Sequence, residues 1–128
     1  RQGSAGHLVN ISSLAGDSDR YGAYSISKAA VNRLGKVLRT ELEQDDIRVT
    51  TIIPGGFATQ LAWGLSEEYL ARFLTAASAA GFNPESEDAH RVLGNPQHIA
   101  DVVRYVLEQP IDLNLEEITL RPPINLDL

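Results

Sequence analysis

The sequence contains no cysteine and no methionine, and only 6% of its 128 residues are aromatic. Without cysteine, disulfide bonds and thiolate metal sites are excluded. The net charge of −6 argues against a nucleic-acid surface, which needs clustered lysine and arginine, and against binding to an anionic membrane. No apolar run approaches the roughly 18 residues of a membrane-spanning helix, and no signal-peptide pattern is present. We therefore expect a cytoplasmic protein that binds neither nucleic acid nor membrane.

The chain has enough apolar material for one globular core, since 43% of its residues are hydrophobic. Its length fits a single domain, and no linker, repeat or low-complexity segment interrupts it. The sequence starts with Arg1 and lacks a start methionine, so we expect a fragment or a processed chain. We therefore expect residues 1–128 to form one partial domain.

Hydrophobic patterning predicts strands and helices that alternate along the chain. Strand residues are apolar and β-branched, and a proline–glycine pair stops the second strand. Ser66 and Asn95 are suitable N-caps of helices, and Gly81 is suited to end one. The predicted strands are 7–12, 48–56 and 116–122, and the predicted helices are 23–44, 66–81 and 96–109. This order predicts an α/β fold, a doubly wound parallel sheet of which three strands and their intervening helices are present.

The predicted 23–44 helix carries more apolar residues than one contact with a sheet requires. Its broad apolar face consists of Ile26, Ala30, Leu34, Val37 and Leu38, widened by Val31 and Leu42. We therefore expect two buried sides, one against the sheet and one against another helix, and a homo-oligomer in which this helix pairs with its copy. Gly35 lies in mid-helix, where glycine costs about 1 kcal/mol relative to alanine, and close packing is its simplest explanation.

Polar loops follow the first two predicted strands. Ligands of a parallel α/β sheet bind beyond the carboxyl ends of its strands. The first strand ends in Ser-Ser-Leu-Ala-Gly at 12–16, and the second in Pro-Gly-Gly-Phe-Ala-Thr at 54–59. Tyr24 and Lys28 lie in the first turns of the intervening helix, whose N-terminus points to the same edge. The sequence therefore predicts a ligand site at this edge of the sheet.

Tyr24 and Lys28 form a candidate proton-transfer pair, because residues four apart lie on one face of a helix. A tyrosine hydroxyl ordinarily has a pKa of about 10, and a nearby ammonium stabilises the phenolate. A tyrosine tuned in this way can exchange a proton with a carbonyl or alcohol oxygen, and a neighbouring serine can donate a hydrogen bond to that oxygen. This group supplies no hydride, so a redox cofactor must do so.

These motifs, at residues 10–16, 24–28 and 54–59, resemble the classical branch of the short-chain dehydrogenase/reductase family. The likeness covers nearly the whole chain but only the C-terminal half of that family's Rossmann-like fold. It implies an NAD(P)-dependent oxidoreductase that interconverts a secondary alcohol and a carbonyl. In this family likeness, Tyr24 is the general acid/base, and Lys28 favours its ionised form and holds the nicotinamide ribose.

The resemblance implies roles for neighbouring residues as well. Ser13 would orient the substrate carbonyl, and Ser12 is the second choice because the loop before Tyr24 is shorter than is usual in the family. The nicotinamide end of the cofactor would be lined by Pro54, Gly55, Phe57 and Thr59. The substrate would contact Ser13, Leu14, Tyr21 and Trp63. Partial burial in a helix contact explains Trp63 equally well, and residues 61–90 correspond to the family's substrate loop.

A softer likeness concerns the cofactor and the class of substrate. Residues 98–122 are similar to the branch that acts on short 3-hydroxy acids such as serine, often with NADP, so we favour NADP over NAD. No Gly-x-x-x-Gly-x-Gly turn occurs in the sequence. We therefore expect that the half of the fold that binds adenosine and pyrophosphate is absent, and that these 128 residues alone are inactive.

Two other functions remain open. A nucleotide-sugar epimerase or dehydratase would use the same Tyr24 and Lys28, although the serine and proline–glycine motifs favour the oxidoreductase. A truncated remnant could instead persist without catalysis as a folded, self-associating module. The three histidines lack metal-ligand spacing, so we expect surface or capping roles for them and no bound metal; they are His7, His90 and His98.

Overall fold

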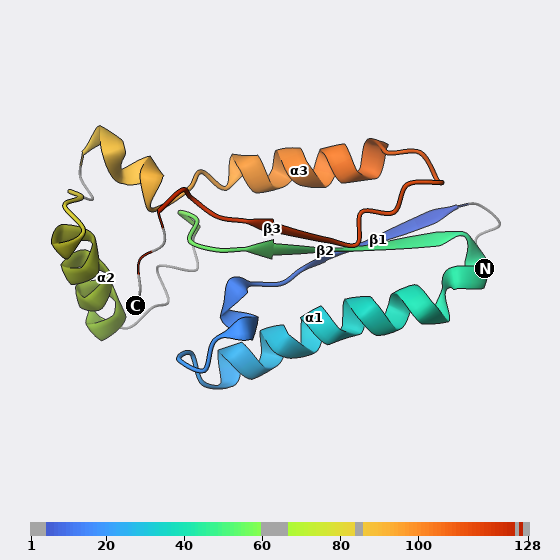
Figure 1. Cartoon of the computed structure of the whole chain (residues 1–128), viewed down its shortest axis with the longest axis horizontal. Coiled ribbons are helices and arrows are strands. Elements are labelled where there is room, and N and C mark those ends of the chain that lie inside the picture. Colours follow the sequence, from blue (N-terminus) through green and yellow to red (C-terminus); the bar gives the residue numbers. More distant parts are fainter. Residues whose placement is uncertain (1–4, 60–66, 84–85, 125, 127–128) are drawn as a thin grey trace. The chain divides into compact units, whose positions relative to one another are not determined.

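The computed structural model describes residues 5–59, 67–83, 86–124 and 126 (Figure 1). The chain divides into two compact units. The first comprises Arg1–Gly55 and Ile99–Leu120, and the second comprises Gly56–His98 and Arg121–Leu128. Within the described ranges, no helix combines the length and the apolar character needed to cross a membrane.

A three-stranded parallel sheet forms the centre of the first unit. Its strands, in spatial order, are β1 (Gly6–Ile11), β2 (Ile47–Pro54) and β3 (Glu117–Leu120). Ile11 pairs with Ile52, and Leu120 pairs with Pro54, so the carboxyl ends of the strands share one edge. The central strand β2 is buried over most of its length, as expected for a strand with neighbours on both sides. The predicted parallel α/β arrangement is therefore confirmed.

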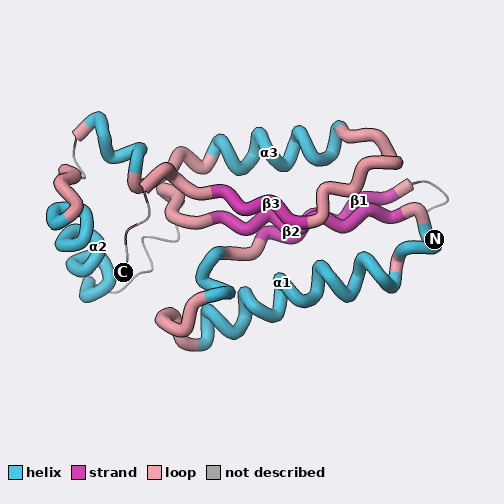
Figure 2. The backbone as a smooth tube through the Cα atoms, viewed as in Figure 1, coloured by secondary structure: helices cyan, strands magenta, loops and turns pink. Residues whose placement is uncertain are grey.

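Helices cover the two opposite faces of this sheet (Figures 1 and 2). Helix α1 (Ala23–Glu41) connects β1 to β2 on one face, and α3 (Gln97–Glu108) precedes β3 on the other. Helix α1 ends before the predicted Gln44, because the chain tightens into a 3₁₀ turn at Glu43–Asp45. Asp46 then adopts a left-handed φ of 53° and leads the chain into β2.

The side of α1 that meets the sheet carries small and polar residues. Its two buried residues are Ser25 and Gly35, and a Cβ at Gly35 would collide with the Thr51 side chain of β2. Gly35 is therefore explained by close packing, as predicted. Three large apolar residues point outward instead, with exposed fractions of 74% for Ile26, 46% for Leu34 and 38% for Val37. The predicted apolar face is thus divided: these three residues are exposed, whereas Val31, Leu38 and Leu42 are half-buried.

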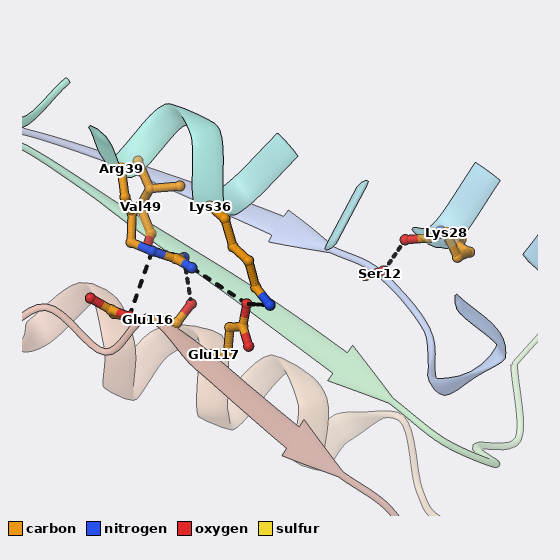
Figure 3. A network of polar contacts seen from close by, with 7 residues as sticks. All are labelled: Ser12, Lys28, Lys36, Arg39, Val49, Glu116 and Glu117. Atoms are coloured by element: carbon orange, nitrogen blue, oxygen red, sulfur yellow. Dashed lines mark hydrogen bonds and ion pairs between the residues drawn. The ribbon is translucent and has the colours of Figure 1, made fainter. Parts of the chain in front are cut away.

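Arg39 links α1 by hydrogen bonds to β2 and to the residue that precedes β3 (Figure 3). Its guanidinium donates hydrogen bonds to the carbonyl oxygens of Val49 at 3.4 Å and Glu116 at 3.0 Å. Its Nη2 lies 3.4 Å from Oε1 of Glu117, which also pairs with Lys36 at 3.5 Å. The Arg39 side chain is only 13% exposed, so charge-assisted bonds to backbone carbonyls hold this part of the helix in place of apolar packing.

The second unit has its own helix and turns. It contains helix α2 (Glu67–Ala79) and a 3₁₀ turn at Glu87–Arg91. Gly81 has a φ of 80° and lies two residues after Ala79, the last residue of α2, which confirms it as the helix stop. Asn95 accepts a 2.9 Å hydrogen bond from the N–H of Gln97 and so acts as the predicted N-cap. Ser66, the predicted cap of α2, lies outside the described residues.

Candidate functional site

Tyr24 and Lys28 lie on consecutive turns of α1 and face each other, as their spacing predicted. The Lys28 Nζ atom lies 5.7 Å from the centroid of the Tyr24 ring, within the range of a cation–π contact. Both residues are half-buried. The ammonium and the phenol therefore share one partly solvated face near the N-terminus of the helix.

The end of β1 holds Lys28 through two hydrogen bonds. The Lys28 ammonium donates to the carbonyl oxygen of Ile11 at 3.3 Å. In the opposite direction, the Ser12 hydroxyl donates to the carbonyl oxygen of Lys28 at 3.1 Å (Figure 3). Ser12 is only 4% exposed, and its N–H donates to the carbonyl of Ile52 in β2 at 2.8 Å. The lysine is therefore fixed at the carboxyl edge of the sheet.

Ser13 follows directly and caps a short 3₁₀ turn at Leu14–Asp17. Its side chain is half-buried, and its Oγ accepts a hydrogen bond from the N–H of Ala15 at 3.1 Å. Gly16 brings this turn against α1, where a Cβ on the glycine would lie 2.9 Å from the backbone carbon of Lys28. The loop of residues 12–17, called the serine loop from here on, is therefore packed on the helical turn that carries the lysine, a contact that requires glycine at this position.

The other residues predicted to contact a substrate flank this loop. Leu14 and Tyr21 are half-buried, and the carbonyl of Tyr21 accepts a 3.2 Å hydrogen bond from the N–H of Tyr24. Gly22 has a φ of 54°, so the chain turns sharply into α1 at a position that favours glycine. Trp63 lies outside the described residues.

Pro54 and Gly55 lie at the carboxyl end of β2. Pro54 is buried and is the last residue of the strand. The N–H of Gly55 donates to the carbonyl of Leu120 at 2.7 Å, which continues the pairing with β3 by one residue. Because β1 and β2 are parallel, this turn belongs to the same edge of the sheet as Ser12.

Phe57 and Thr59, the remaining predicted cofactor contacts, belong to the second unit. Phe57 forms an isolated parallel bridge with Gly94, and a Cβ on that glycine would lie 2.6 Å from the phenyl ring. Thr59 is exposed, and its N–H donates to the carbonyl of Phe57 at 2.9 Å. The first unit thus contains the serine loop, Tyr24, Lys28 and the Pro54–Gly55 turn, and the second contains these two residues.

Sequence analysis missed the setting of His7 at the start of β1. Its Nε2 lies 2.8 Å from the hydroxyl of Thr50, and its Nδ1 is buried without a hydrogen-bond partner. Burial lowers the pKa of His7, and the charge of Arg48 lowers it further. His7 is therefore half-buried and links β1 to Thr50 of β2, a contact that the expected surface or capping role did not include. Among the residues that the structure describes, no three histidine, aspartate or glutamate side chains gather as a metal site.

Comparison with known proteins identifies the family. The family model for short chain dehydrogenases matches residues 1–70. An uncharacterised oxidoreductase of Staphylococcus aureus strain MW2 is 35% identical over 121 residues, which are 93% of this chain and 43% of that protein. A relative from Staphylococcus saprophyticus is 31% identical over 125 residues, with the same two coverages. The chain therefore belongs to the short chain dehydrogenase family, and it spans less than half the length of these curated relatives.

Solved structures of the family share the fold. The closed form of serine dehydrogenase complexed with NADP⁺ matches with a TM-score of 0.66 and 23% identity, covering 91% of this chain and 44% of that one. The type-2 3-hydroxyacyl-CoA dehydrogenase of Mycobacterium avium matches with a TM-score of 0.65 and 30% identity, covering 95% and 44%. These matches confirm the predicted Rossmann-like α/β fold.

Proposed function

We propose that this chain carries the proton-transfer site of an oxidoreductase that interconverts a secondary alcohol and a carbonyl with a nicotinamide cofactor. The observation that supports this most directly is the Lys28 ammonium, which faces the Tyr24 ring and is bonded to the last carbonyl of β1. Ligands of parallel α/β sheets bind beyond this edge. In this proposal Tyr24 is the general acid/base, and Ser13 orients the substrate oxygen.

The proposed reaction moves one hydride and one proton. A nicotinamide cofactor held by Lys28 and Tyr24 at this edge would supply or accept the hydride at the substrate carbon. In the reducing direction, Tyr24 donates its phenolic proton to the carbonyl oxygen and becomes a phenolate. The positive charge of Lys28, 5.7 Å from the ring centroid, stabilises that phenolate. The Ser13 hydroxyl donates a hydrogen bond to the same substrate oxygen while negative charge develops on it.

The hydrogen bonds of the two serines support Ser13 for this role. The hydroxyl proton of Ser12 is donated to the Lys28 carbonyl, and the residue is only 4% exposed. Ser13 is half-buried, and its oxygen acts as an acceptor towards the N–H of Ala15, which leaves the hydroxyl proton available for donation. We therefore retain Ser13 as the residue that orients the substrate oxygen.

The chemistry of the residues present fits the nicotinamide end of a dinucleotide. The Lys28 ammonium and the Tyr24 hydroxyl can hydrogen-bond to ribose hydroxyls, and the backbone of the Pro54–Gly55 turn lies at the same sheet edge. By family resemblance we assign Phe57 and Thr59 to this end as well. We favour NADP over NAD because residues 98–122 resemble the branch that acts on 3-hydroxy acids. Fold relatives were solved with either cofactor: serine dehydrogenase with NADP⁺ and 4-hydroxyisoleucine dehydrogenase with NADH.

The test is Tyr24→Phe in the protein expressed from its complete gene, assayed with short 3-hydroxy acids. We expect kcat/KM to fall by at least about 100-fold, because a positioned acid/base contributes that much or more. Binding of NADPH, followed by fluorescence titration, should be largely retained. Tyr105→Phe makes the same change at a residue of α3 that is 56% exposed, and it should alter neither quantity. Near-normal turnover of the Tyr24→Phe protein would contradict the assignment.

A further inference from the structure

Ser12 has no part in the proposed chemistry, yet it is one of the most buried polar residues of the first unit, with an exposed fraction of 4%. Its N–H donates to Ile52 in β2 at 2.8 Å, and its hydroxyl donates to the Lys28 carbonyl at 3.1 Å (Figure 3). The backbone of Ser12 is thus hydrogen-bonded to the sheet, and its side chain is hydrogen-bonded to α1. Ser12 therefore joins the central strand to the helical turn that carries Lys28.

The contact between the strand end and the helix runs in both directions. The carbonyl of Lys28 accepts from Ser12, while the ammonium of Lys28 donates to the carbonyl of Ile11 at 3.3 Å. Ile11 and Ser12 are adjacent in sequence, so the two bonds join neighbouring residues at the end of β1 to the same residue of α1. A displacement of the helical turn away from the strand end breaks both bonds, which makes the position of the ammonium depend on the Ser12 hydroxyl.

We infer that Ser12 is a positioning residue, which sets the place of the Lys28 ammonium and thereby the charge beside Tyr24. This inference rests on the proposed roles of Tyr24 and Lys28, but it concerns a residue that touches neither substrate nor cofactor. The Lys28 carbonyl lies within a helix and keeps its intrahelical bond when the hydroxyl is removed. The variant loses the hydrogen bond that links this helical turn to the end of β1. The distance between the Lys28 ammonium and the Ile11 carbonyl is then no longer fixed.

Ser25 provides a matched control on the same helix as Lys28. It lies in the first turn of α1 and is 7% exposed, and its buried hydroxyl has no hydrogen-bond partner. Ser25→Ala therefore removes the same atom from a similarly buried site without breaking a bond. Ser12→Thr is the complementary variant, because it changes the packing but keeps the hydroxyl.

The two lysines of the sequence make the position of Lys28 measurable. Lys36 lies on the same helix, and its side chain is 52% exposed and pairs with Glu117, so it serves as an internal reference. The protein from the complete gene, without cofactor, is reductively methylated to a low extent, and peptide mass spectrometry gives the ratio of labelling at Lys28 to that at Lys36. Ser12→Ala should raise this ratio about three- to tenfold, the effect of losing one hydrogen bond. Ser12→Thr and Ser25→Ala should leave the ratio near its original value.

The activity of the same variants gives a second readout. In the alcohol-oxidising direction, Ser12→Ala should lower kcat and leave KM nearly unchanged, because a displaced ammonium stabilises the phenolate less in the transition state. Ser12→Thr should restore kcat, whereas a merely structural role would lower the amount of active protein without changing the kcat of the folded fraction. If circular dichroism shows that Ser12→Ala does not fold, Ser12→Cys has nearly the same size and a weaker donor, and it should shift both readouts in the same direction.

The outcomes separate this inference from the proposed function. An unchanged labelling ratio in Ser12→Ala overturns the inference, as does an equal rise in Ser25→Ala or in Ser12→Thr. If that ratio is unchanged while Tyr24→Phe abolishes activity, the proposed function stands and the positioning role fails. A raised labelling ratio in Ser12→Ala, together with full turnover in Tyr24→Phe, would show that Ser12 positions Lys28. It would also show that this position does not matter for catalysis.

Discussion

The two helices that flank the sheet of the first unit present different side chains to it. Helix α3 buries a branched apolar side chain, since Val106 is 0% exposed, while Arg104, Tyr105, Leu107 and Glu108 are exposed. Helix α1 instead has an inner stripe of small and polar residues at intervals of three and four, namely Ser25, Lys28, Asn32, Gly35 and Arg39. Its outer face, defined by Ile26, Leu34 and Val37, carries exposed apolar side chains. The same sheet is thus covered by one helix whose buried residue is a valine and by one whose buried residues are a serine and a glycine.

The inner stripe shows what α1 gains from this arrangement. Lys28 and Arg39 are bonded to backbone carbonyls of the strands, and Gly35 brings the helix close to β2. Hydrogen bonds are directional, whereas apolar contacts such as that of Val106 depend on buried area and not on direction. The helix that carries Tyr24 is therefore held in a defined position along the strands. Three of its large apolar residues, Ile26, Leu34 and Val37, are left exposed.

The largest effect that we predict concerns the outer face of α1. We propose that this face packs against its copy in a homo-oligomer. Leu34→Glu should then weaken self-association by about 100-fold or more, because a truncated hot-spot contact and a buried charge both oppose binding. Light scattering across a dilution series of the protein from the complete gene measures this change.

Leu70→Glu is the control for that experiment, because Leu70 is similarly exposed, at 51%, but lies on α2 in the second unit. It should leave the association constant unchanged. An original protein that is monomeric at all concentrations would contradict the oligomer, and so would equal weakening by the two glutamate substitutions.

The division between the two faces of α1 also shows what could be predicted from the sequence. The helical period placed Tyr24 and Lys28 on one side, and the apolar pattern identified the residues of the outer face, because both depend only on neighbouring positions. Which side of the helix meets the sheet could not be predicted, since that depends on contacts between residues far apart in sequence. Arg39, for example, donates to Glu116, which lies 77 residues away.

In the candidate site, too, the contacts between residues far apart in sequence could not be predicted. The strand-end motifs and the Tyr24–Lys28 spacing predicted that the end of β1, Tyr24 and Lys28 lie close together at the carboxyl edge of the sheet, and the structure places them there. The bond from Ser12 to the Lys28 carbonyl and the close approach of Gly16 to α1 had no local signal. They arise from the way in which the serine loop folds back on the helix, and a sequence pattern does not specify that path.

A smaller effect is expected at Gly35, where the inner stripe of α1 comes closest to β2. Gly35→Val should lower the free energy of unfolding by about 1–3 kcal/mol, because overpacking a close contact costs that much. The steric reason is the Thr51 side chain, with which even a Cβ at this position collides. Ala29→Val introduces the same β-branched side chain at an exposed position of the same helix that lies outside the apolar face, so its cost should be limited to helix propensity, a few tenths of a kcal/mol. Urea denaturation of the two variants gives the comparison, and equal midpoints would show that Gly35 does not determine the helix–sheet distance.

The smallest effect is expected for Val37→Ala in α1. We compare it with Val106→Ala, the same substitution in α3, to measure how the two helices differ in burial. Val106→Ala should cost about 2 kcal/mol at any protein concentration, since it removes two buried methyl groups and leaves a cavity. Val37 is 38% exposed, so Val37→Ala should cost less than about 0.5 kcal/mol in dilute protein, where the outer face of α1 is in water. When the concentration is raised until the oligomer forms, the cost of Val37→Ala should approach that of Val106→Ala, because association stabilises the folded state by mass action. Urea denaturation at several concentrations measures both costs. A cost of Val37→Ala that stays small at every concentration would place this residue outside the interface, even if Leu34→Glu had disrupted the oligomer.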